Sequence, residues 1–175
     1  MNSFSITSRL LHWLIALHML ALIALGWWMV DLTYYSSWYN LAPALHKMFG
    51  VLVFALGLLL LIYRRFRAAP RALENHTALE KTASKIAHWT LLVAVITIPI
   101  SGYIFTTATG DGVDLFSIAT LPAMFTVSDT VRDLAIDFHI YASYGLLAVI
   151  AAHAGGALKH HFIDRDRTLR RMTVG

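Results

Sequence analysis

The chain has 175 residues, of which 58% are hydrophobic and only 14% are charged, and its mean hydropathy is +0.62. A soluble domain of this length carries about 25% charged residues, so the composition favours a membrane protein. There is no cysteine, which excludes disulfides, thiolate metal sites, cysteine-ligated iron–sulfur clusters and covalently attached c-type haem. Any bound metal must be held by histidine, carboxylate or methionine.

Four long apolar stretches follow one another along the chain. Each has 20 or 21 residues, close to the roughly 20 that a transmembrane helix needs. Strands are not expected in them, because the apolar runs are continuous and lipid admits strands only in closed barrels. The sequence therefore predicts an all-α, integral membrane four-helix bundle formed by a single domain over residues 1–175. The predicted spans are 11–30, 44–63, 86–105 and 138–158.

The distribution of Lys and Arg predicts the orientation of the bundle, because cytoplasmic loops carry an excess of both. Twelve of the fourteen lie before span one, between spans two and three, or after span four. Only Lys47 and Arg132 lie on the opposite side, where the linkers are acidic. Both termini are expected in the cytoplasm, and the net charge of +4 gives little reason to expect nucleic-acid binding. The twelve are Arg9, Arg64, Arg65, Arg67, Arg71, Lys81, Lys85, Lys159, Arg165, Arg167, Arg170 and Arg171.

Span four carries two histidines on nearly the same helix face. His139 and His153 are fourteen residues apart, which is about 40° short of four full turns and roughly 21 Å along the axis. That rise is most of the ~30 Å hydrocarbon thickness of a bilayer. The spacing suggests two redox centres, one near each membrane surface.

Two further histidines match these depths. His12 begins span one on the cytoplasmic side, where His153 lies near the end of span four. His46 begins span two on the outer side, level with His139. Each pair could supply both axial ligands of one haem through neutral imidazoles. A single histidine near a helix end can instead hydrogen-bond water at the interface, but the two matched pairs favour ligands.

Span two adds a strip of small residues. Gly50 and Gly57 lie four and eleven residues after His46, close to the same helix face. Such a strip leaves room for a flat macrocycle, and Gly50 is therefore a candidate haem contact. Close helix–helix packing is the competing interpretation, because membrane helices also use glycine there.

The other polar residues near the spans receive secondary roles. Quinone chemistry requires protons, and histidine titrates near neutrality, so we predict a quinone or proton site on the cytoplasmic side from His88, His160 and His161. An interfacial basic cluster is the alternative for the last two. Haem propionates would be compensated by Lys47 and Arg132 outside and by Arg9 and Lys85 inside. His18 is expected to pack between helices, and His76 to be solvated in its basic linker.

Four motifs cover the chain: RLLHWL around His12, HKMFG from His46, IAHWTLL with IPISGY over 86–103, and the paired histidines of span four with the tail ALKHHFIDRDRTLRRM. With them the chain resembles the bacterial cytochrome b561 family of di-haem, four-helix inner-membrane proteins. The resemblance implies two non-covalent haems b, at His12/His153 and His46/His139, and electron exchange with ubiquinone near the cytoplasmic haem. Some members oxidise superoxide at the outer face, and the b subunits of membrane hydrogenases and formate dehydrogenases have a similar layout.

Three functions remain open from the sequence. The first is a freestanding oxidoreductase that passes electrons from an outer small-molecule donor, such as superoxide, to ubiquinone. The second is an electron-transfer subunit that serves a partner dehydrogenase or hydrogenase, although the brief outer linkers leave little surface for docking. The third is a proton or metal transporter that uses the histidines without haem.

Overall fold

Four long helices make up most of the chain in a computed structural model, which describes residues 3–67, 70, 73, 76–115 and 118–174. Each helix is long and apolar enough to cross a membrane, and the predicted four-helix membrane fold is confirmed. Arg71, one of the twelve basic residues used for orientation, lies outside the described residues. The helices are α1 (Ile6–Met29), α2 (Leu41–Phe66), α3 (Ala78–Thr106) and α4 (Asp129–Phe162).

The helices extend beyond the predicted apolar spans because polar residues cap and prolong them. The side chains of Ser5 and Ser128 accept hydrogen bonds from the first turns of α1 and α4. Thr77 and Glu80 form a reciprocal capping box at the start of α3, which satisfies two amide donors. At 1.5 Å per residue, α4 is about 51 Å long, so its ends project past the ~30 Å hydrocarbon layer.

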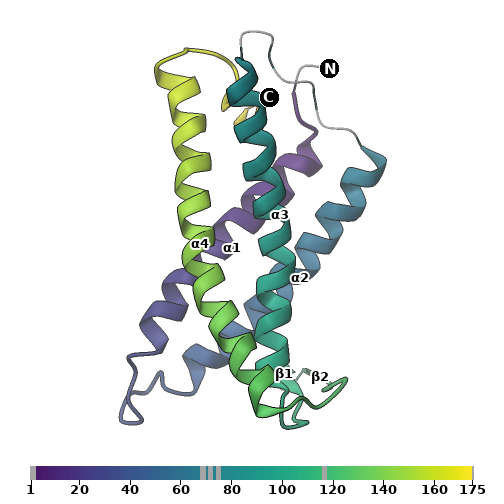
Figure 1. The fold of residues 1–175 in the computed structure, drawn as a ribbon, viewed down its shortest axis with the longest axis vertical. Coiled ribbons are helices and arrows are strands. Elements are labelled where there is room, and N and C mark those ends of the chain that lie inside the picture. The colour runs from purple at the N-terminus through teal and green to yellow at the C-terminus, as the bar shows by residue number, and fades with distance from the viewer. Residues whose placement is uncertain (1–2, 68–69, 71–72, 74–75, 116–117, 175) are drawn as a thin grey trace.

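The two ends of the bundle differ. Both chain termini lie at one end (Figure 1), which we call the terminal end. At the other end, the linker between α3 and α4 forms an antiparallel hairpin of β1 (Val113–Leu115) and β2 (Ala119–Leu121), with Val113 paired to Leu121. We call this the hairpin end, and the sequence had not indicated the hairpin. A short helix, α5 (Arg170–Thr173), lies in the C-terminal tail.

The buried core between the helices is small. Many large apolar side chains of the spans face outward, including Leu17, Ile62 and Trp89, as lipid-facing helices require. The core is a single cluster near mid-height whose members come from all four long helices. Its buried residues are Ile15, Met19, Leu22, Ile23, Val53, Val95, Ile98 and Leu146.

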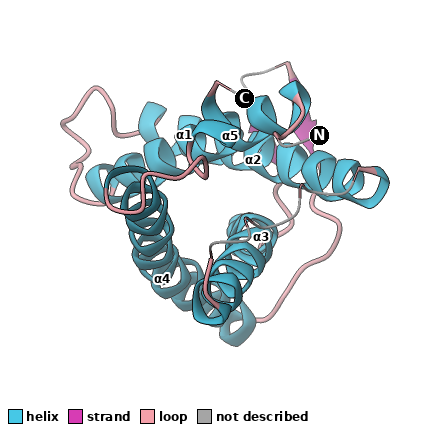
Figure 2. Ribbon diagram, turned by 90° about the horizontal axis from the view of Figure 1, so that it is seen from above, coloured by secondary structure: helices cyan, strands magenta, loops and turns pink. Residues whose placement is uncertain are grey.

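The helices do not pack equally against one another. α3 packs along α4, α1 packs on α2, and α2 packs on α3, whereas α1 meets α4 at few places. Viewed from above, α3 and α4 lie on one side of the bundle, facing α1 and α2 (Figure 2). The histidines described next lie where α4 faces α1 and α2.

Candidate functional site

Two pairs of histidine rings face each other across the bundle. His46 of α2 and His139 of α4 have ring centroids 6.0 Å apart at the hairpin end. His12 of α1 and His153 of α4 have centroids 6.2 Å apart toward the terminal end. Two imidazoles that bind one metal ion from opposite sides, with metal–nitrogen bonds of about 2 Å, hold their centroids roughly 6 Å apart. Both separations therefore fit an ion between the rings, as in a bis-histidine haem.

The ring of His139 is oriented by the backbone of α3. Its Nδ1 lies 3.0 Å from the Ile98 carbonyl oxygen, and because a carbonyl only accepts, Nδ1 carries the proton. The Ser101 hydroxyl donates to the same carbonyl at 2.7 Å and lies 3.2 Å from Nδ1. These contacts leave the lone pair of Nε2 directed away from α3. Metal-binding histidines usually donate their other ring N–H to a carbonyl or carboxylate in the same way.

Two glycines make room for the hairpin-end rings. A Cβ on Gly26 would lie 3.2 Å from Cε1 of His46, and a Cβ on Gly102 would lie 3.1 Å from Cε1 of His139. Neither glycine was predicted as part of the site. A signal was present, because Gly26 follows His12, and Gly102 follows His88, by the same fourteen residues that separate the two histidines of α4. That spacing places each glycine on the histidine face of its helix.

The two glycines of α2 have different surroundings. No atom of the described residues approaches within 4 Å of a Cβ built on Gly50, so the space beside it is open. On Gly57 a Cβ would lie 2.5 Å from Cγ1 of Val95, which makes Gly57 a helix-packing residue. Open space at Gly50 and a buried His46 Nδ1 with no hydrogen-bond partner among the described residues both fit a planar group beside α2.

A third histidine joins the terminal-end pair. The ring of His88 lies 4.9 Å from that of His153, at an interplanar angle of 72°, and its Nδ1 lies 3.3 Å from the Ser84 hydroxyl. The separation of 4.9 Å is too short for an ion between two opposed imidazoles. His12 is therefore the better partner for His153, and His88 lies beside the pair.

The prediction that His76 is solvated is wrong. Its side chain is only 12% exposed and contacts Asp166 at 3.0 Å, and its ring stacks on His160 with centroids 4.2 Å apart. The basic linker was expected to be hydrated, but Asp166 and Thr168 of the C-terminal tail contact His76. His161 packs on Phe162 instead, and among the described residues no contact joins His160 or His161 to His88.

The remaining predicted residues have simple surroundings. Lys47 is exposed, Arg132 pairs with Asp129 and Asp133 at 2.7 and 2.9 Å, and Arg9 donates to the Thr173 carbonyl at 2.9 Å. Nδ1 of His18 lies 2.7 Å from the Leu14 carbonyl in its own helix. Lys47 and Arg132 are the predicted partners of haem propionates near the hairpin end. Lys47 is better placed than Arg132 to bind a propionate, because Arg132 is already paired with two carboxylates.

Comparisons with known proteins identify relatives along almost the whole chain. The sequence profile of the family described as prokaryotic cytochrome b561 matches residues 3–175. "Cytochrome b561 homolog 2" of Escherichia coli (strain K12) is 34% identical over 97% of this chain and 90% of its own length. "Cytochrome b561 homolog 1" of the same strain is 29% identical over 98% and 97%. "Probable superoxide oxidase CybB" of Yersinia pestis is 23% identical over 93% and 90%.

Proposed function

The chain belongs to the prokaryotic cytochrome b561 family, and from that premise we propose that it binds two haems b and carries single electrons between an outer donor and ubiquinone. Membership makes it a multi-pass electron-transfer protein of the bacterial inner membrane, of the oxidoreductase type, with haem b bound by histidine. The number of haems, their ligands and the two substrates are the proposal.

The ligand assignment depends on the paired rings. We assign His12 and His153 to one haem and His46 and His139 to the other, because each pair combines a 6.0–6.2 Å centroid separation with placement on opposite helices. Haem iron supplies a one-electron redox couple when bound. The two proposed ligands on α4, His139 and His153, lie roughly 21 Å apart along the helix axis. That rise nearly spans the apolar layer.

Orientation follows from the charges at the two ends. The terminal end carries most of the Lys and Arg residues, whereas the hairpin-end linkers are acidic apart from Lys47 and Arg132. Since cytoplasmic loops are enriched in Lys and Arg, the terminal end is the cytoplasmic one. The His46/His139 pair then lies near the outer face and the His12/His153 pair near the cytoplasm.

Reduction of ubiquinone to ubiquinol takes two electrons and two protons, so a proton donor is needed near the cytoplasmic haem. His88 is the first candidate, because its ring lies against that of His153 and imidazole titrates near neutrality. His161 lies farther along α4 toward the cytoplasm and can relay protons from solvent, whereas His160 is held against Asp164 and Asp166. A shallow apolar groove between α3 and α4, which includes Ala87 and Ala152, offers the quinone tail a surface at this end.

Superoxide is the outer donor that we favour. One relative, which aligns over 93% of this chain and 90% of its own length, is described as a probable superoxide oxidase. Each superoxide anion gives one electron and leaves dioxygen. Lys47, exposed one residue after His46, provides local attraction for an anion within otherwise acidic surroundings.

The purified protein tests the proposal without partners. Pyridine haemochrome analysis should give two haems b per chain, and stopped-flow spectroscopy should show reduction by superoxide and reoxidation by ubiquinone. If superoxide leaves the haems oxidised while a dehydrogenase reduces them rapidly, the chain is instead a partner-dependent subunit. A haem-free protein would favour a transporter.

A further inference from the structure

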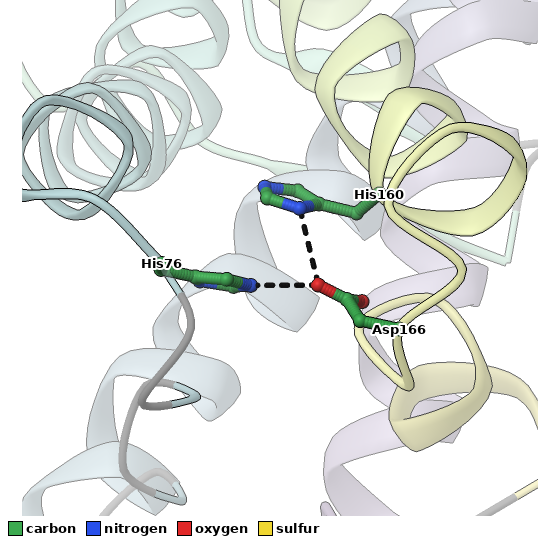
Figure 3. Close-up of side chains that lie close together, drawn as sticks. All are labelled: His76, His160 and Asp166. Atoms are coloured by element: carbon green, nitrogen blue, oxygen red, sulfur yellow. Dashed lines mark hydrogen bonds and ion pairs between the residues drawn. The ribbon is translucent and has the colours of Figure 1, made fainter.

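A second cluster of metal-binding side chains lies outside the haem sites, at the terminal end. His76 precedes α3, His160 lies in the last turn of α4, and Asp166 lies in the tail (Figure 3). Nε2 of His76 and Nδ1 of His160 approach the same Asp166 Oδ2 at 3.0 and 3.2 Å. All three ligand atoms lie within 4.8 Å of one another.

The spacing of these atoms suits a transition-metal ion. Tetrahedral ligands that bind zinc at 2.0–2.1 Å lie about 3.3 Å from one another, which is close to the two contacts with Asp166. Two imidazoles and one carboxylate also match the ligand preference of zinc and related divalent ions, whereas Mg²⁺ and Ca²⁺ prefer oxygen ligands. The side chains are about nine-tenths buried, with 12%, 12% and 9% exposure for His76, His160 and Asp166.

Nδ1 of His160 is buried and lies beside two carboxylates. Oxygens of Asp164 and Asp166 are 2.8 and 3.2 Å away, but neither contact has hydrogen-bond geometry within the described part of the chain. An ion between the rings and Asp166 would take this nitrogen as a ligand in place of these contacts.

A neighbouring group of possible metal ligands is already bound to a lysine side chain. Glu80, His160 and Asp164 also lie within ligand distance of one another, but the Lys159 ammonium bonds to both carboxylates, at 2.9 Å in the case of Asp164. Asp166 has no such lysine contact and is held by Thr168, whose amide donates to Oδ1 at 2.7 Å. Burial alone would raise the pKa of Asp166, but hydrogen bonds from Thr168 and His76 outweigh it and hold the pKa well below its usual range.

We propose that His76, His160 and Asp166 form a binding site for a divalent transition-metal ion of the zinc class, which ties the linker before α3 and the C-terminal tail to the end of α4. The site is separate from the haem ligands and does not depend on how electrons enter or leave the protein.

Isothermal titration of the haem-loaded protein in detergent with Zn²⁺ tests the site, since bound haem occupies the other histidine pairs. We expect one zinc ion per chain, and at least tenfold weaker binding in His76→Ala and Asp166→Asn. The matched control is His161→Ala, which removes the neighbouring histidine and should leave zinc affinity unchanged. Wild-type protein that binds no zinc at 100-fold molar excess, or binding that survives both variants, would overturn the proposal.

A second measurement needs no variant. Zinc K-edge X-ray absorption of the wild-type complex should show the scattering pattern of two imidazoles plus oxygen ligands. A first shell without imidazole places the ion elsewhere and contradicts the site. Haem absorbance is followed in parallel, and it should be the same for wild type and all three variants, which separates failure of this site from failure of the haem assignment.

Discussion

The two ends of α4 present histidines in unlike surroundings. His139 is fixed by the Ile98 carbonyl and faces His46, and glycines lie against both rings. His153 faces His12 but also has His88 against it. The rings of His46 and His139 are thus held in one arrangement before any ligand binds. The rings of His12 and His153 instead adjoin a further titratable group, His88. The difference fits the roles proposed above, with a fixed redox site at the hairpin end and a site that exchanges protons as well as electrons at the terminal end.

The largest expected effect is the loss of one haem of two. His46→Ala or His139→Ala should remove the hairpin-end haem and leave most of the other, and His12→Ala or His153→Ala should do the converse, because an axial ligand is lost. Haem content and reduced-minus-oxidised spectra measure this. His18→Ala is the control and should keep both haems. Loss of a haem in the His18 variant with retention in the His12 variant would show that the wrong histidine of α1 was assigned.

His88 should matter at one end only. Removal of a general acid costs roughly 100-fold or more in rate, so His88→Ala should slow reoxidation by ubiquinone by at least tenfold. Both haems and the rate of reduction by the outer donor should be kept. Stopped-flow traces of the two half-reactions separate these effects. Unchanged quinone reoxidation would mean that the proton comes from elsewhere and that the two ends differ less than proposed.

The glycines test whether the hairpin-end rings are preset. A Cβ on Gly26 or Gly102 meets a histidine ring at 3.2 or 3.1 Å, so Gly26→Val and Gly102→Val should lower occupancy of the hairpin-end haem several-fold and spare the other. Gly155→Val is the matched control, because it lies two residues after His153 and so on the opposite face of α4. The space around its Cβ position is open among the described residues, and the β-branched side chain has a similar cost in a helix. Equal loss of both haems in all three variants would point to general destabilisation.

The smallest effect should come from Ser101. Ser101→Ala removes the hydroxyl that contacts Nδ1 of His139 but leaves the Ile98 carbonyl in place. Loss of the partner that orients a ligand histidine typically costs 10–100-fold in metal affinity, and the remaining bond to the Ile98 carbonyl should keep the loss below that range. A redox titration should show a shift in one of the two haem waves only. A shift of both waves, or of the terminal-end wave alone, would contradict the assignment of His139.

Composition and spacing in the sequence were enough to predict four membrane helices, because hydropathy and helical rise act locally. They also paired His12 with His153 and His46 with His139 by depth, and the folded chain brings those rings within 6.0–6.2 Å. The full lengths of α3 and α4 were not predicted, since polar capping turns carry no hydropathy signal.

Only the tertiary structure distinguished Gly50 from Gly57. Gly57 packs against Val95 of another helix, whereas the space beside Gly50 is open. It also brought His76 to His160 and Asp166 across ninety residues of chain. Sequence periodicity shows which residues share a helix face, but the direction in which a linker or tail folds back depends on contacts between distant segments. The proposed haem ligands lie on regular helices and could be found by counting, whereas the proposed metal site depends on a linker and a tail and could not.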